Sequence, residues 1–542
     1  MRAARIVSGI EIATMIAAIL TVLLACLVPI YTDEVNWLLL RSRYFLDGGN
    51  TILFNLVSCT DTFAAPPPWF MVPFRAANAW LYDGLEDPLR IRLTSVATMV
   101  AVFGILLYLL RHAFPPRFGT LRLTAVMAAF ATLGVMPFLL VLDRPEQHLL
   151  AGCGLLMFLP LARDEQRSGC SAAAVTGFVV SLAMFSIHPK ALFFLPLMVI
   201  SIWYLVPAGT LAVAAIGLLS AAAWVSFLDW EGRLACPNDG YIRALQEQTN
   251  LSPALLAHPG EFLARLIRNE TGMYHPLSYF SSILFRDHYM SDWLPPGLSG
   301  GSWPGLLNLL LLALFGLLGV TFLAALLALV SEAWRRRRMP AELALVLALL
   351  ASLASLAIFQ AVKNVYEATL VVPLFGLAVM LVVHDRRGRN WRRIRTIGGS
   401  VLLVISLVSQ VTLWSLFAPS AIAEWTKGGY LPNQRYSYSP FHYDRARSEI
   451  LDTSRRCGIE RDGRMSHLVV DEFTYPMFAN TREPFLIGYI SGGYGHGISN
   501  LERLLIERRS AGVIVGCLHL PPELRSAAVQ NGDFCCLPAF RP

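Results

Sequence analysis

Two adjacent carboxylates, Asp33 and Glu34, stand directly after the first long apolar segment, which covers residues 6–30. About twenty apolar residues span a bilayer, so this segment can cross a membrane and leave the acidic pair at its interface. Residues 37–46 then alternate apolar side chains with arginines, as an amphipathic helix lying on a membrane does. A carboxylate outside the lipid can serve solvation alone, but a pair beside such a helix indicates a chemical site.

Three short turns between later apolar segments carry further polar residues on the same expected side of the bilayer. They hold Asp143 and Glu146 after the third segment, His188 and Lys190 after the fifth, and Lys363 and Tyr366 after the ninth. Each turn alone has a simple structural explanation, since hairpins are polar and a lysine can extend its ammonium to the interface from an exterior turn. Together, acids and cations on one side favour a phosphate-bearing lipid held by cations beside a base.

The composition places the whole chain in a membrane. Of its 542 residues 55% are hydrophobic and only 15% are charged, and the mean hydropathy is +0.53. Such values, with apolar runs of spanning length, are typical of a polytopic membrane protein. The first segment lacks a small-x-small cleavage site and is therefore expected to be a retained helix.

Hydrophobic periodicity predicts about eleven membrane helices in a bundle over residues 1–417. The expected spans are 6–30, 91–110, 121–141, 147–162, 171–187, 190–206, 209–228, 304–331, 341–361, 369–383 and 397–417. With a cytoplasmic N-terminus, seventeen arginines fall at cytoplasmic ends, against Arg144, Lys190 and Lys363 in the opposite short loops. This asymmetry predicts that the loops 31–90 and 229–303 and the tail lie outside the cytoplasm. The net charge of +7 is therefore explained by the membrane topology and by contact of the cytoplasmic loops with anionic lipid. The sequence contains no nucleic-acid-binding module.

The tail 418–542 changes composition and is expected to form a small extracytoplasmic α/β domain. Short apolar runs at 467–470 and 512–515 predict buried strands, and 501–508 and 522–529 predict helices. Six of the nine cysteines fall outside the membrane, an even number in a compartment that permits disulfides. They are Cys59, Cys236, Cys457, Cys517, Cys535 and Cys536. The other three, Cys26, Cys153 and Cys170, are expected to pack as small apolar side chains in or beside helices.

The loop 31–90 contains the run Asp61 to Phe74, in which Pro66, Pro67 and Pro68 precede Trp69 and a helix start. Prolines fix an extended path, and the aromatic side chains suit a membrane interface. An acidic pair after the first helix, a surface helix and a PP-aromatic-aromatic element together resemble the GT-C glycosyltransferases that use polyprenyl-phosphate sugars. These include aminoarabinose, mannosyl and galacturonosyl transferases. The acidic turn 143–146 and the tail beyond the last span are also similar to that family.

The resemblance implies an inverting transfer of sugar from a polyprenyl-phosphate donor to a cell-envelope acceptor, such as lipopolysaccharide, its lipid A or another glycan. It implies that the enzyme works at the outer face of a bacterial inner membrane. Asp33 takes the role of the base, while Glu34 and Asp143 orient the acceptor or a metal. If a divalent cation such as Mg²⁺ or Mn²⁺ is bound, its candidate ligands are Asp33, Glu34 and Asp143. The donor phosphate is assigned to His188, Lys190 and Lys363. Further candidates for substrate binding are Glu146, Tyr366, Arg75 and His275.

Two departures from the family pattern concern the substrate more than the reaction. Ala65 stands where relatives often have His or Glu, and Pro68 replaces a usual apolar residue. Two other classes of function stay open. A transporter or flippase would show ionisable residues within helices and duplicated halves. A polysaccharide polymerase or ligase would carry essential Arg and His residues in a large outer loop, and loop 229–303 contains such residues.

Overall fold

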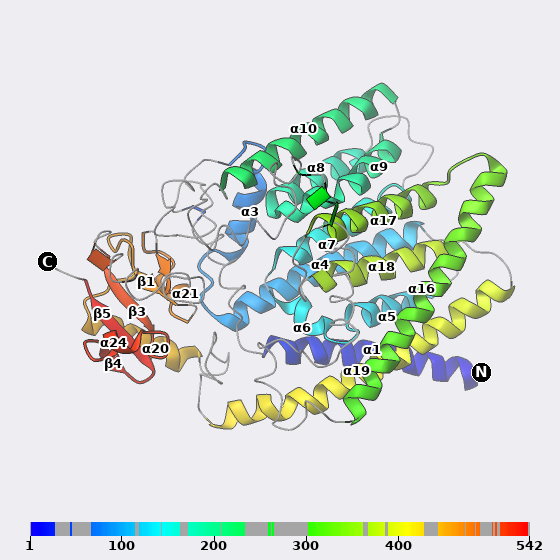
Figure 1. The fold of residues 1–542 in the computed structure, drawn as a ribbon. Helices are drawn as coiled ribbons and strands as arrows, with labels where there is room; N and C mark the ends of the chain where they lie inside the picture. The colour runs from blue at the N-terminus through cyan, green and yellow to red at the C-terminus, as the bar shows by residue number, and fades with distance from the viewer. Residues whose placement is uncertain are drawn as a thin grey trace.

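The computed structural model shows a bundle of apolar helices joined to a small α/β domain at the C-terminal end of the chain (Figure 1). Its description covers residues 2–27, 44–45, 67–113, 119–142, 144–162, 172–206, 209–233, 258, 260–261, 263–264, 302–360, 367–384, 389–427, 443–471, 473–482, 484–487, 501, 505–506 and 510–539. The expected fold class, a mostly helical membrane bundle with a small C-terminal sheet, is confirmed in this part of the chain.

The first half of the bundle contains helices that follow the apolar runs closely. They are α1 (Arg2–Cys26), α3 (Val72–Tyr82), α4 (Pro88–Ala113), α5 (Thr120–Ala131), α6 (Met136–Val141), α7 (Pro145–Phe158), α8 (Ala172–Ile187), the 3-10 helix η1 (Pro189–Phe194), α9 (Leu195–Leu205) and α10 (Gly209–Arg233). The helix α1 packs against α5 and α6, while α7 packs against α4 and α8. Their contacts bury leucine, phenylalanine and methionine side chains in one continuous core.

The second half adds four long helices around that core. They are α16 (Ser302–Arg336), α17 (Ala341–Phe359), α18 (Glu367–His384) and α19 (Arg389–Lys427). The helix α18 packs against α7 and α16, and α19 packs against α1 and α5. Six of the described helices are long and apolar enough to cross a membrane, and four shorter apolar helices accompany them. The number of eleven crossings therefore stays a prediction.

Three expected spans differ from the observed helices. The span 121–141 is broken into α5 and α6, because Gly134 has a positive φ of 56° and Pro137 lies in the first turn of α6. The span 190–206 opens as the 3-10 helix η1, with Pro189 at its start. The last span continues to Lys427 with Pro419 inside the helix, beyond the expected end at 417.

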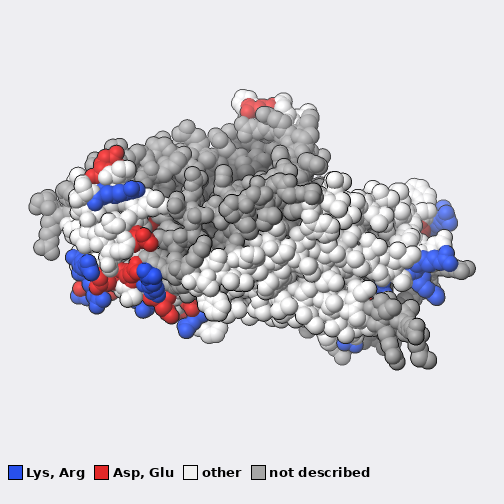
Figure 2. Space-filling model, turned by 90° about the horizontal axis from the view of Figure 1, so that it is seen from below, with Lys and Arg blue, Asp and Glu red and all other residues white. Residues whose placement is uncertain are grey.

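The bundle has two chemically different ends. At one end, which we call the arginine-rich end, Arg122 of α5 meets the first turns of α19, and Arg395 of α19 donates to the carbonyl of Val383 near the end of α18. The α/β domain lies at the other end (Figure 1). Figure 2 shows Lys and Arg gathered at one end of the described surface, charges of both signs over the α/β domain, and a broad uncharged belt between them. Such a belt is the surface that a bilayer requires.

The α/β domain contains α20 (Tyr443–Arg456), β1 (Val469–Val470), α21 (Tyr475–Phe478), β2 (Phe485–Leu486), β3 (Gly512–Gly516), α24 (Pro522–Arg525), β4 (Val529–Asn531) and β5 (Phe534–Pro538). The strand order is β2-β1-β3-β5-β4, with β2, β1 and β3 parallel and β5 antiparallel to both of its neighbours. The strands expected at 467–470 and 512–515 are confirmed. The helix expected over 522–529 is wrong at its end, because α24 stops at Arg525 and Val529 starts the hairpin that turns at Gly532-Asp533. Most of 501–508 lies outside the described residues.

Two disulfides tie this domain together, one on each face of the sheet. Successive residues of a strand point to opposite faces, so Cys535 and Cys536 of β5 reach different partners. Cys536 pairs with Cys457 after α20, and Cys535 pairs with Cys517 after β3. The expected disulfides are confirmed for these four residues, while Cys59, Cys236 and Cys170 lie outside the described part. Cys26 and Cys153 are buried thiols outside these disulfides and lie among apolar side chains, as expected.

The α/β domain is attached to the bundle through the segment between α3 and α4. Tyr82 is fully buried in the same hydrophobic cluster as Ile450 of α20 and Phe478 of α21. Next to it, the carboxylate of Glu86 accepts hydrogen bonds from Arg447, at 3.4 Å, and from Arg461. Apolar burial combined with these ion pairs holds the domain over one end of the bundle.

Candidate active site at the domain end of the bundle

A buried ionic network lies where α7, η1, α17 and α18 meet. The ammonium of Lys190 is 2.6 Å from Oε1 of Glu146 and 2.6 Å from Oε1 of Glu367. The guanidinium of Arg144 donates to both oxygens of Glu146, at 3.1 and 3.3 Å, and Nε2 of Gln360 donates to Glu367 at 2.8 Å. The network therefore contains two cations and two carboxylates, a balanced set among the described residues.

Both carboxylates of the network stand at the start of a helix. Glu146 stands in the first turn of α7, after Pro145, and Glu367 is the first residue of α18. The N-terminus of a helix presents unpaired N–H groups and a partial positive charge, which stabilise an anion. Both side chains have no exposed surface, so helix dipoles and the neighbouring cations replace the lost hydration.

Lys190 lies in the interior, which corrects the expectation that it stands in an exposed exterior turn. The residue is only 9% exposed, because η1 packs against α17 and α8 and turns the side chain into the bundle. Two carboxylates on elements far apart in the sequence then compensate its charge. Its burial has a consequence for mutagenesis, since removing one partner of a buried ion pair leaves uncompensated charge.

His188 forms the corner that places Lys190. It is the N-cap of η1, with extended backbone at φ −160° and ψ 144°, and its Nδ1 accepts a 3.0 Å hydrogen bond from the backbone N–H of Lys190. An acceptor Nδ1 carries no proton, so the neutral ring carries its proton on Nε2. The imidazole lies 6.3 Å, between ring centroids, from the indole of Trp230.

A second buried ion pair lies on the other side of this corner. Arg75 of α3 is 3.1 Å from the carboxylate of Asp229 near the end of α10, and both side chains are 7% exposed. The Nε of Arg75 also donates to the carbonyl of Ser186 at 3.3 Å, and its guanidinium lies 5.8 Å from the ring of Trp230. The junction 186–190 between α8 and η1 therefore joins the two ion clusters.

The end of α1 is fixed at the same end of the bundle. Arg92, a fully buried residue of the first turns of α4, donates to the carbonyls of Ala25 and Cys26 at 3.2 and 3.4 Å. These are terminal carbonyls of α1 that no residue of the helix can satisfy.

Several predicted site residues lie outside the described part of the chain. They are Asp33, Glu34, Asp143, Lys363, Tyr366 and His275. Of the predicted residues that the structure describes, it brings His188, Lys190 and Glu146 into one neighbourhood, with Arg75 on its edge. No three His, Cys, Asp or Glu side chains of the described residues converge as metal ligands, and the three carboxylates assigned to a cation lie outside this set. A divalent cation therefore stays a prediction.

The sequence reasoning missed Glu367 and Asp229 as members of the site, and it placed Arg144 only by topology. A signal for both acids was present, because each stands at the end of an otherwise apolar helix. A charge at such a position is costly in lipid unless it has a partner. The identity of that partner depends on the three-dimensional packing of α3, η1, α10 and α18.

Neither a family model nor a curated protein sequence matches this chain. Solved structures resemble it over most of its length at low identity. The apo oligosaccharyltransferase of Archaeoglobus fulgidus is 12% identical, with a TM-score of 0.42, over 93% of this chain and 69% of that one. ArnT from Cupriavidus metallidurans, solved with bound undecaprenyl phosphate, is 10% identical with a TM-score of 0.40, over 98% of both chains. At such scores the comparison gives no information about residues or substrate.

Proposed function

We propose that this chain is a membrane glycosyltransferase that moves a sugar from a polyprenyl-phosphate donor to a cell-envelope acceptor. The acceptor class is lipopolysaccharide, its lipid A or another envelope glycan. The reaction takes place at the outer face of a bacterial inner membrane, with the N-terminus in the cytoplasm. The two disulfides of the α/β domain support this placement, because disulfides persist in oxidising compartments.

The observation that carries the proposal is the cluster of buried cations beneath the α/β domain. Lys190, Arg144 and Arg75 come from different elements and lie around one junction, 186–190, at the end of an apolar bundle. A polyprenyl-phosphate lipid has its chain in the bilayer and its phosphate at the interface. Cations held at that level by rigid helix ends suit such a phosphate, since charge-assisted hydrogen bonds to phosphate are strong.

Lys190 is the residue that we assign to the donor phosphate, with His188 beside it. An ammonium has three N–H donors, and the two carboxylates account for two of them among the described residues. The third donor serves a phosphate oxygen. Glu146 and Glu367 are then positioning residues, which hold the ammonium in place without reorganisation when charge develops on the leaving phosphate.

The chemical step that we propose is one displacement at the anomeric carbon. The acceptor oxygen forms the new glycosidic bond, the bond between the anomeric carbon and the phosphate oxygen breaks, and polyprenyl phosphate leaves. The acceptor proton goes to Asp33, while Glu34 and Asp143 orient the acceptor or a divalent cation. Inversion at the anomeric carbon follows from the single displacement. Lys363 is a further candidate for the donor phosphate, and Tyr366, Arg75 and His275 are the remaining candidates for substrate binding.

A comparison of lipid extracts from cells with and without the gene tests this function. Mass spectrometry should show one sugar missing from lipopolysaccharide, its lipid A or another envelope glycan, and plasmid-borne wild-type gene should restore it. Loss of a repeat-unit polymer with its core sugars intact would favour a polymerase or ligase. Unchanged glycans, with altered distribution of a lipid between leaflets, would contradict the proposal and favour a flippase.

A further inference from the structure

We propose that the arginine-rich end of the bundle contains a binding site for one anionic phospholipid of the bilayer. An acyl chain lies in an apolar cavity between α5, α16, α18 and α19, and the phosphate lies against the arginines at its rim. The site is separate from the proposed active site, which lies at the opposite ends of α17 and α18. This inference does not depend on the glycosyltransferase proposal.

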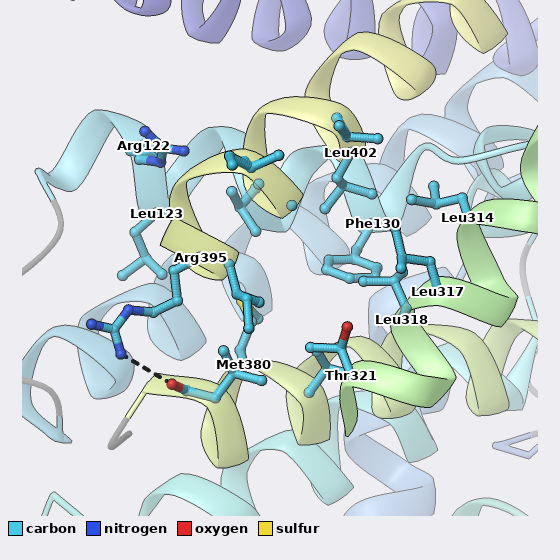
Figure 3. A pocket seen from close by; sticks show the side chains of 18 of the residues that line it. Arg122, Leu123, Phe130, Leu314, Leu317, Leu318, Thr321, Met380, Arg395 and Leu402 are labelled. Atoms are coloured by element: carbon cyan, nitrogen blue, oxygen red, sulfur yellow. Dashed lines mark hydrogen bonds between the residues drawn. The ribbon is translucent and has the colours of Figure 1, made fainter. Parts of the chain in front are cut away.

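The cavity has a volume of about 350 Å³ and is lined almost entirely by apolar side chains. Figure 3 shows Phe130, Leu317, Leu318, Met380 and Leu402 around it, contributed by all four helices. Leu317 is 55% exposed, so the cavity faces the surface that meets lipid. A wall of this composition suits hydrocarbon and offers few partners to water.

The rim of the cavity carries three arginines, Arg122, Arg393 and Arg395. Nη2 of Arg122 donates to the carbonyl of Thr396 at 2.8 Å and lies 3.4 Å from the hydroxyl of Ser400. Arg395 is fixed through the carbonyl of Val383 at 3.1 Å, as the dashed line in Figure 3 shows. None of the described residues that line the cavity is acidic.

The arrangement of cations above an apolar wall has the dimensions of a lipid site. From Arg122 to Phe130 the helix α5 rises about 12 Å, and from Arg395 to Leu402 the helix α19 rises about 10 Å. A phosphate at the rim therefore places the first part of an acyl chain against the cavity wall. Basic pockets between membrane helices bind anionic lipid headgroups in this way.

A second cavity shows which feature selects the lipid. It has a volume of about 300 Å³, and no charged side chain of the described residues lines it; Thr132 is its one polar residue. An acyl chain that enters either cavity leaves an equally apolar bilayer, so apolar contact alone gives little preference. Preference for a headgroup comes from the arginines, and only the first cavity has them. We therefore commit to an anionic phospholipid of the surrounding leaflet.

The site permits two independent ways to block it. Arg122→Gln with Arg395→Gln removes two rim charges. Gly398→Leu fills the cavity instead, because Gly398 lines it and no atom lies within 4 Å of the position that a Cβ would take. Leucine also favours the helix more than glycine does, so α19 is expected to keep its fold. Matched controls are Arg335→Gln with Arg338→Gln, both exposed, and Gly319→Leu, which has the same open space on α16 but does not line the cavity.

Native mass spectrometry of the full chain in detergent, titrated with phosphatidylglycerol or phosphatidylcholine, tests the proposal. The wild type and both controls should retain one phosphatidylglycerol at least about tenfold more strongly than phosphatidylcholine, the worth of one charge-assisted contact. The double arginine variant should lose that preference, and Gly398→Leu should lose the bound lipid. If the arginine variant does not fold, Gly398→Leu against Gly319→Leu decides the question. Equal retention of both lipids by the wild type, or unchanged retention by Gly398→Leu, would overturn the proposal.

Two competitors complete the test. Glycerol phosphate, added in excess, should not displace the lipid, and displacement would show a simple phosphate site. Undecaprenyl phosphate at equal concentration should displace phosphatidylglycerol no better than a second phosphatidylglycerol does. Preferential displacement would identify a site for a polyprenyl lipid and would contradict the assignment to a bilayer phospholipid.

Discussion

The ammonium of Lys190 lies 2.6 Å from Oε1 of Glu367, although 177 residues separate them in the sequence. The contact joins the start of η1 to the start of α18, and both ends face the α/β domain. Lys190 therefore has two possible roles, in stability and in donor binding. These roles can be separated experimentally, because Arg144 and Glu146 form a charge-balanced ion pair of their own. That pair can remain when Lys190 and Glu367 are both replaced.

The first prediction concerns this separation. Lys190→Met leaves two buried carboxylates with one fewer cation and should destabilise the folded protein by about 3 to 5 kcal/mol. Adding Glu367→Gln restores the charge balance and should recover most of that loss, since isosteric neutral groups often replace buried pairs at little cost. Thermal unfolding in detergent measures both variants. If Lys190 binds the donor, the double variant should fold and still use donor about ten- to a hundredfold less well below saturation. Donor use at the wild-type level would reduce Lys190 to a structural role.

Arg75 is the subject of a second prediction. Arg75→Lys keeps the positive charge but loses the rigid, planar guanidinium. In the wild type that one group donates hydrogen bonds to both the Asp229 carboxylate and the Ser186 carbonyl. We expect the KM for donor to rise about tenfold, the cost of one charge-assisted bond, with a smaller change in kcat. Arg90→Lys, at an exposed position of α4, is the matched control and should behave as the wild type. Unchanged kinetics in Arg75→Lys would exclude Arg75 from substrate binding.

The third prediction concerns the disulfides. The bond between Cys457 and Cys536 closes 79 residues, and the bond between Cys517 and Cys535 closes 18. Loop-closure entropy gives the first about 4.5 kcal/mol and the second about 3 kcal/mol in the chain-entropy model. Paired Cys→Ala variants should therefore destabilise the α/β domain in that order, as measured by protease resistance of the tail in the intact protein. Equal resistance of both variants would argue against the entropic account.

Topology gives a fourth prediction. Arginines gather at the end of the bundle away from the α/β domain, so the tail should lie outside the cytoplasm. Alkaline phosphatase fused after Arg508 should be active, and a fluorescent protein that matures only in the cytoplasm should stay dark at that position. The reverse result would invert the orientation and remove the oxidising compartment that the disulfides need.

Periodicity was sufficient to predict most helices of the bundle, because a membrane span must satisfy its backbone internally and stay apolar over a fixed length. It failed at Gly134, where a local turn interrupts an apolar run, and at Pro419, which lies inside α19 although the helix was expected to end before it. Lys190 and Glu146 were identified because they interrupt apolar runs in short turns. That Glu367 completes their network, and that Asp229 holds Arg75, depends on helix packing between distant segments, which no local pattern encodes.

The most direct test of the proposed reaction is sugar transfer by purified protein in nanodiscs, supplied with a polyprenyl-phosphate sugar and an acceptor lipid. Asp33→Asn keeps the size of the side chain but removes the proton acceptor, so transfer should fall by about a hundred- to ten-thousandfold. Glu34→Gln should have a smaller effect if Glu34 only orients the acceptor, and thermal unfolding of both variants should match the wild type. Transfer by Asp33→Asn at more than about a tenth of the wild-type rate would contradict the assignment of Asp33 as the base.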